Sequence, residues 1–76
     1  MPHIDVKFFK RELSEQERTA FADELCAVVK KHLGSKDSAL SVALTGVEPS
    51  AWKEDVYDVE ILPAMDSLAK KPGYSM

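Results

Sequence analysis

The sequence has 76 residues, which suffices for one small domain and not for two. It is 45% hydrophobic and 30% charged, the balance of a folded chain rather than of a disordered one. Ten basic against thirteen acidic residues give a net charge of -3, so the chain has no general positive field for nucleic acid or an anionic membrane. We therefore expect a single domain, residues 1–76, that acts on neither.

Three features predict a cytoplasmic protein. The single cysteine, Cys26, cannot form an intrachain disulfide of the kind that stabilises many small secreted domains. The most apolar stretch, residues 39–47, is far shorter than the roughly 20 residues that span a bilayer. The first residues also lack the basic and apolar segments of a secretory signal. We expect the N-terminus to be kept except for Met1, because a small residue such as Pro2 favours removal of the initiator methionine.

Local patterns predict a strand followed by a long helix. Residues 4–8 alternate apolar and polar side chains, which is typical of a half-buried strand. Ser14 and Glu17 have the spacing of a capping box, so a helix is expected to begin there, and Gly34 is suited to end it in the left-handed conformation. The three- and four-residue spacing of one set of side chains predicts a stripe that packs on a sheet: Phe21, Leu25, Val28, Val29, His32 and Leu33.

A second strand and a second helix are expected to follow. Residues 38–46 alternate again, and because a helix of about 20 residues separates the two strands, they should be parallel. A second helical pattern is carried by Val59, Leu62, Met65 and Ala69. Pro63 interrupts it, so we expect a kinked or late-starting helix that ends at residues 70–73. The prediction is an α/β fold: a β-α-β unit with two parallel strands, one long crossover helix and a shorter C-terminal helix.

Such a unit is incomplete as a monomer. One helix covers a single face of a two-stranded sheet, and both edges of the sheet stay open. Pairing the sheets of two or more subunits would extend the ladder and bury apolar side chains, so we expect a homo-oligomer.

Pro2 is the residue most suited to carry chemistry. Without Met1 it begins the first strand with a free secondary amine held by the fold. Such an amine titrates nearer neutrality than lysine, and burial near cations lowers its pKa further, so the neutral amine is a base. The candidate cations are Lys7, Lys10 and Arg11. Arg11 should lie on the order of 30 Å from Pro2 of its own chain, because nine strand residues separate them, so an antiparallel neighbour would have to supply it.

These features resemble the 4-oxalocrotonate tautomerase family, over the whole chain: Pro2 after the initiator Met, a strand, Arg11 ahead of Ser14-Glu15-Gln16-Glu17, one long helix and a second strand. The resemblance implies a cofactor-independent isomerase in which Pro2 moves a proton between the enol oxygen and the carbon of a 2-oxo acid such as enol-phenylpyruvate. It implies that Arg11 binds the substrate carboxylate or carbonyl, that Trp52 is an aromatic wall of the site, and that the assembly is a dimer. No metal is expected.

One departure bears on the substrate. Ser41 stands where larger-oligomer members of the family carry a second arginine, and it cannot stabilise negative charge as a cation would, which disfavours dicarboxylates. Two other functions stay open: a hydratase or dehalogenase that uses a protonated Pro2, and a dimeric binding module without activity. Trp52 equally fits a core or interface position, and Arg11 a solvated loop.

Overall fold

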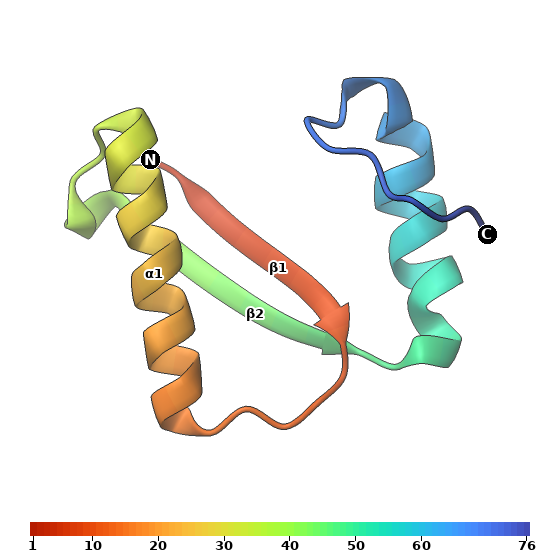
Figure 1. The fold of residues 1–76 in the computed structure, drawn as a ribbon, viewed down its shortest axis with the longest axis horizontal. Coiled ribbons are helices and arrows are strands. Elements are labelled where there is room, and N and C mark those ends of the chain that lie inside the picture. Colours follow the sequence, from red (N-terminus) through yellow and green to blue (C-terminus); the bar gives the residue numbers. More distant parts are fainter.

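A two-stranded parallel sheet lies at the centre of the molecule, between α1 and a C-terminal helical segment (Figure 1). The computed structural model describes residues 1–76. The elements in chain order are β1 (His3–Phe9), α1 (Glu15–Leu33), η1 (Asp37–Ala39), β2 (Ser41–Val47), η2 (Pro49–Ala51), η3 (Lys53–Ile61) and η4 (Leu62–Ser67). We call residues 49–67 the C-terminal helical segment and residues 68–76 the C-terminal tail. The predicted β-α-β unit with a shorter C-terminal helix is thus confirmed.

The two strands pair in parallel along their whole length. The register runs from His3 opposite Ser41 to Phe9 opposite Val47. The second strand begins at Ser41 rather than at the predicted Ser38, because a turn of 3₁₀-helix, η1, occupies residues 37–39. In this turn the N–H of Leu40 donates to the carbonyl of Asp37 at 3.1 Å, so these residues are not free to join the ladder.

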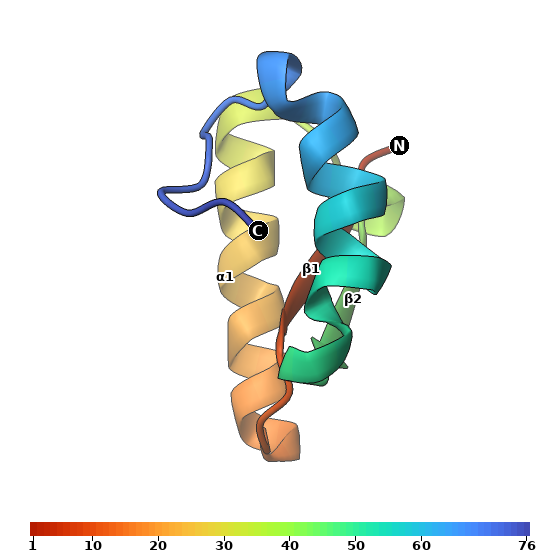
Figure 2. The same cartoon turned by 90° about the vertical axis from the view of Figure 1, so that its right-hand side faces the viewer.

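The two faces of the sheet meet different partners. Side chains alternate along β1, and Lys7, on the face of the odd-numbered residues, reaches Glu60 of η3. This face therefore faces the C-terminal helical segment. The apolar side chains of residues 4, 6 and 8 project from the other face, and Figure 2 shows α1 on the far side of the sheet from that segment. The predicted alternation therefore matches the two-sided packing.

Both predicted ends of α1 are confirmed. The hydroxyl of Ser14 accepts the backbone N–H of Glu17 at 3.1 Å, and the Ser14 N–H donates to the Glu17 carboxylate at 3.0 Å. The Ser14 N–H bond, followed by the hydroxyl contact, lowers the pKa of Glu17 below its ordinary value. At the other end Gly34 has φ 65°, the left-handed conformation, and its N–H donates to the carbonyl of Lys30.

The predicted apolar stripe of α1 is only partly covered. Phe21, Leu25 and Val29 are half-buried, whereas Val28 is 55% exposed and Leu33 68% exposed. Two strands form a surface too narrow to cover a full helix face, so side chains at the margins of the stripe stay in contact with solvent.

The C-terminal helical segment differs from the predicted helix at both ends. It begins with η2 and η3, before the first predicted residue, and it ends at Ser67 instead of at residues 70–73. The late start expected from Pro63 is wrong; instead the helix type changes just before Pro63: η3 is a π-helix whose last bond runs from the Leu62 N–H to the Tyr57 carbonyl, and η4 is 3₁₀. Proline has no N–H, so the five-residue bonding cannot continue past Leu62.

The molecule is open, with a very small interior. Only Val56 and Tyr57 are buried, at 4% and 3% exposure, and both belong to η3. The accessible surface is 5839 Å², whereas a compact chain of 8.5 kDa exposes about 4,700 Å². The radius of gyration is 14.1 Å, against about 11 Å for a compact domain of this length. No helix here is both long and apolar enough to span a bilayer.

Replacing Gly34 by alanine tests the end of α1. A Cβ at Gly34 meets no atom within 4 Å, so the change strains only the left-handed backbone. We expect Gly34→Ala to lower the free energy of unfolding by about 1 kcal/mol, measured by urea denaturation at fixed protein concentration. Gly73→Ala is the matched control, because that position is equally open and has no positive φ. Equal effects of the two variants would contradict this explanation of the helix end.

Candidate active site

Pro2 lies at the beginning of β1, and the fold holds it in place. Its carbonyl accepts the backbone N–H of Ser41 at 3.4 Å, and the residue is half-buried. Met1, by contrast, is fully exposed. The sheet therefore fixes Pro2, whereas the residue before it projects into solvent.

A hydrogen bond lies beside Pro2 at the same end of the sheet. His3 Nδ1 and the hydroxyl of Ser41 are 2.6 Å apart, across the first register pair of the two strands. Ser41 is the residue in the position of the expected second arginine, and its hydroxyl is already bound to an imidazole. This end of the sheet therefore offers polar groups and no arginine.

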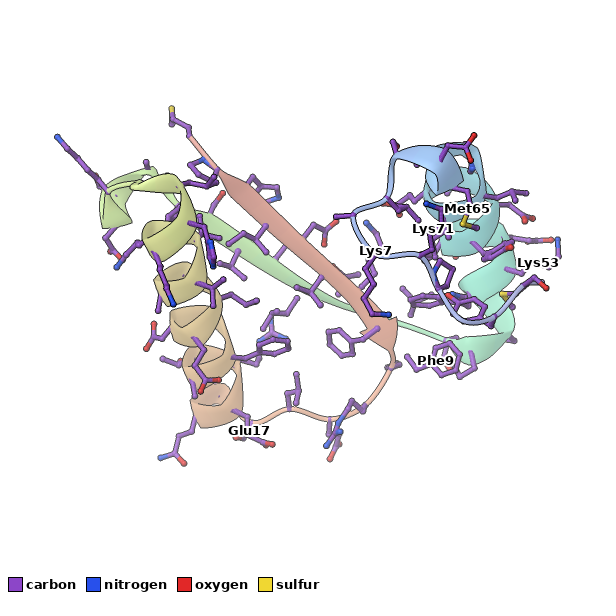
Figure 3. The ribbon with its side chains drawn as sticks, turned by 45° about the horizontal axis from the view of Figure 1, so that its top comes forward. Lys7, Phe9, Glu17, Lys53, Met65 and Lys71 are labelled. Atoms are coloured by element: carbon purple, nitrogen blue, oxygen red, sulfur yellow. The ribbon has the colours of Figure 1, made fainter.

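An ion-pair network occupies the middle of the odd-numbered face. Lys7 Nζ lies 2.6 Å from Asp5 Oδ2 and 3.1 Å from Glu60 Oε2, and it points from β1 toward the C-terminal helical segment (Figure 3). The hydrogen bond from Lys7 lowers the pKa of Asp5, and the bonds to Asp5 and then Glu60 raise the pKa of Lys7. The network joins β1 to η3, and in it the charge of Lys7 is already paired with two carboxylates.

An aromatic pocket lies at the far end of β1. The ring of Phe9 meets Trp52 edge to face, with centroids 5.2 Å apart and an interplanar angle of 81°. Together with the C-terminal tail these rings line a surface pocket of about 430 Å³ that is open to solvent on one side, a volume suited to a small organic ligand. The cavity is lined by Phe9, Trp52, Tyr74, Ser75 and Met76. We call it the aromatic pocket.

Arg11 follows Phe9 by two residues, in the loop that leads to α1, and it is exposed. Of the three candidate cations, Lys7 pairs with Asp5 and Glu60, and Lys10 lies 3.5 Å from Glu48. No carboxylate lies within ion-pair distance of Arg11. Its guanidinium is therefore available for an external anion, which it can bind through two parallel hydrogen bonds.

The candidate residues lie in two groups at opposite ends of β1. Arg11 and Trp52 both lie at the Phe9 end, and Pro2 lies at the other end (Figure 1). A seven-residue strand separates its ends by about 23 Å, so a single protomer does not bring Pro2 into contact with the aromatic pocket. The predicted separation of Arg11 from Pro2 thus agrees with the topology.

Known proteins are similar to this chain over its whole length. A family model described as "Tautomerase enzyme" matches residues 2–53, more than half of the chain, beginning at Pro2. The chain belongs to the tautomerase family. "Tautomerase PptA" of Cronobacter sakazakii is 59% identical over 76 residues and covers 100% of both chains. "Tautomerase PptA" of Pectobacterium carotovorum is 59% identical over 75 residues, 99% of both chains, and that of Escherichia coli O139:H28 is 51% identical over 76 residues, 100% of both.

The family match covers only part of the candidate site of this tautomerase. Pro2, Arg11 and Trp52 lie inside residues 2–53, whereas the tail residues of the aromatic pocket lie outside them. Tyr74 was not among the site residues predicted from the sequence. One signal was present: an aromatic side chain directly after the turn-favouring Pro72-Gly73 pair.

The histidines of the tautomerase do not form a metal centre. No group of three or more His, Cys, Asp or Glu side chains comes together in the fold. His3 bonds to Ser41, and His32 is exposed in the last turn of α1.

The Asp5–Lys7 contact predicts a shifted titration. Because the Lys7 hydrogen bond stabilises the ionised carboxylate, Asp5 should titrate below the ordinary aspartate value of about 3.9. A native pKa below the unfolded value stabilises the fold above the unfolded pKa, and this contribution is lost as the pH falls through the native pKa. We expect the side-chain carboxyl ¹³C signal of Asp5 to show the low midpoint by NMR, and Lys7→Met to return it toward the ordinary value. An unchanged midpoint in Lys7→Met would exclude Lys7 as the cause.

Proposed function

We propose that this tautomerase interconverts the enol and keto forms of a 2-oxo acid such as enol-phenylpyruvate without a cofactor, as a single cytoplasmic domain, with the amine of Pro2 as the base. The observation that most supports the proposal is the place of Pro2: it is held at the start of the sheet by its bond to Ser41, where the family match begins. Removal of Met1 is part of the proposal, because an amide nitrogen is not basic.

The reaction needs only one proton carrier. The neutral Pro2 nitrogen takes the proton of the enol hydroxyl and becomes a secondary ammonium. As the C=O bond forms, the C=C electrons take that proton at the adjacent carbon, and the amine is neutral again. Amine and substrate each return to their starting charge, so no oxidant, reductant or metal is required.

The amine must be neutral at the working pH for this step. An α-amino group has a pKa of about 8, and both burial and a nearby cation lower it. Pro2 is already half-buried in the single chain. A guanidinium beside it would lower the pKa further, and Arg11 is the candidate because no carboxylate lies within ion-pair distance of it.

We propose that Arg11 comes from a second subunit in a homodimer. The surface exceeds that of a compact chain by about 1,100 Å², comparable with the about 800 Å² that each partner buries in a standard interface. β1 is an open edge of a two-stranded sheet. Two β1 edges that pair antiparallel would extend the sheet to four strands and bring the Phe9 end of each protomer to Pro2 of the other.

In this arrangement each residue has a distinct role. Arg11 of the partner binds the substrate carboxylate or carbonyl through its paired N–H groups. Trp52 of the partner shields the reacting atoms from water and packs on the apolar part of the substrate. Ser41 supplies no positive charge, which favours a substrate with one carboxylate.

Replacing Pro2 by alanine tests the base. Pro2→Ala should lower kcat/KM for ketonisation of enol-phenylpyruvate by about 10²- to 10⁴-fold, the usual contribution of a positioned acid–base group. The enol decay is followed by ultraviolet absorbance. Intact mass is the control, since both proteins must lack Met1. Equal rates would leave a binding module or background chemistry, and an activity that requires a protonated Pro2 would favour the hydratase or dehalogenase.

Mixing two inactive variants tests the shared site. In a dimer whose sites combine Pro2 of one chain with Arg11 of the other, a Pro2→Ala/Arg11→Ala heterodimer holds one intact site. An equimolar mixture, unfolded and refolded together, should therefore regain about a quarter of the wild-type rate, because half of the dimers are heterodimers. Chromatography with light scattering should give a dimer mass for every sample. No recovery from the mixture would contradict a site shared between chains.

A further inference from the structure

The C-terminal tail forms most of the aromatic pocket. Tyr74, Ser75 and Met76 supply three of its five lining residues, and Phe9 of β1 and Trp52 before η3 supply the others. In Figure 1 the tail turns back along the C-terminal helical segment after η4 and ends beside η3. The pocket therefore exists only while the tail keeps this position.

One hydrogen bond holds the tail against the rest of the pocket. The indole N–H of Trp52 donates to the hydroxyl oxygen of Tyr74 at 3.1 Å. The indole nitrogen can only donate, so the Tyr74 oxygen satisfies a group that would lack a partner among these apolar side chains. Four of the five lining residues are hydrophobic, so these two side chains supply each other's polar partner within the pocket.

A contact between two aromatic rings also holds Tyr74. The ring of Tyr74 lies against Tyr57, with centroids 5.9 Å apart and an angle of 39°. Tyr57 is one of the two buried residues of the chain. Tyr74 is thus packed against the most buried part of the C-terminal helical segment, while it remains 47% exposed itself.

We propose that Tyr74 is a positioning residue that sets substrate specificity: through its bond to Trp52 it fixes the tail as the closing wall of the aromatic pocket, which binds the aryl side chain of an acid substrate. This inference rests on the proposed tautomerase function. The pocket suits an aromatic ring because two aromatic side chains, Phe9 and Trp52, already meet there edge to face. Arg11, two residues from Phe9 and without an ion pair, supplies the cation that an acid requires.

The hydroxyl of Tyr74 is the group to remove. Tyr74→Phe keeps the ring against Tyr57 and deletes only the acceptor of the Trp52 bond. An aryl substrate depends on the closed wall and a small alkyl substrate does not, so the ratio of their kcat/KM values should fall by about fivefold to tenfold, the equivalent of one hydrogen bond. The loss should appear in KM for the aryl substrate rather than in kcat, because the closing wall binds the ring and does not touch the reacting atoms.

The assay compares enol-phenylpyruvate with the enol of 2-oxobutanoate for three proteins. These are the wild type, Tyr74→Phe and the matched control Tyr57→Phe. The control removes the hydroxyl of the other tyrosine of the ring contact and leaves the Trp52–Tyr74 bond in place. Tyr57→Phe should keep the wild-type ratio. A variant that merely folds less well loses both activities equally, so its ratio would stay unchanged, and an unchanged ratio in Tyr74→Phe overturns the proposal.

A binding measurement separates this inference from the proposed function. Trp52 is the only tryptophan, so its fluorescence reports directly on the pocket. Unreactive 3-phenylpropanoate should quench it saturably, butanoate should not, and Tyr74→Phe should weaken the first titration by about fivefold to tenfold. If ketonisation is absent, the proposed function fails. The titration then still tests whether the aromatic pocket binds an aryl acid. No quenching in the wild type, as expected if a partner chain fills the pocket, would overturn the proposal.

Discussion

The parallel pairing of β1 with β2 constrains every other part of this structure. Because parallel strands cannot be joined by a tight turn, the chain must return along the sheet, and α1 makes that return. The same pairing places the beginnings of both strands at one end, where Ser41 holds Pro2 by its carbonyl. Both strands finish at the opposite end of the sheet, and the C-terminal helical segment follows from there. The position of the amine and that of the aromatic pocket both follow from the direction of two strands.

The two faces of this sheet explain why the protomer is so open. One face is apolar and meets α1, whose apolar stripe is wider than two strands, so that Val28 and Leu33 remain exposed. The other face carries Asp5 and Lys7, and Glu60 joins them from η3. Charged side chains on this face gain little from burial, so they do not hold a helix closely against the sheet as apolar side chains do. The C-terminal helical segment accordingly has its own interior, Val56 and Tyr57, and touches β1 through the ion pairs and the Phe9–Trp52 contact.

The sequence was enough to select most residues of the candidate site. It was not enough to predict how they are arranged. Pro2 and Arg11 could be selected by the chemistry of their side chains, and the separation of Arg11 from Pro2 followed from strand length alone. Trp52 was selected by resemblance, but its neighbours were not foreseen. Tyr74 contributes through a bond to a residue 22 positions earlier, and no pattern in the sequence indicates that the tail turns back toward it.

The sequence by itself determined the elements whose signals are local. The capping box of α1 needs residues three positions apart, the left-handed Gly34 depends on a single residue, and strand alternation depends on neighbours, so each could be predicted without knowing any long-range contact. Only the tertiary structure decided that residues 37–39 leave the ladder, that η3 winds as a π-helix, and that Lys7 meets Glu60, 53 positions away. Those outcomes depend on which distant side chains share one small space, and periodicity carries no information about distance across the fold.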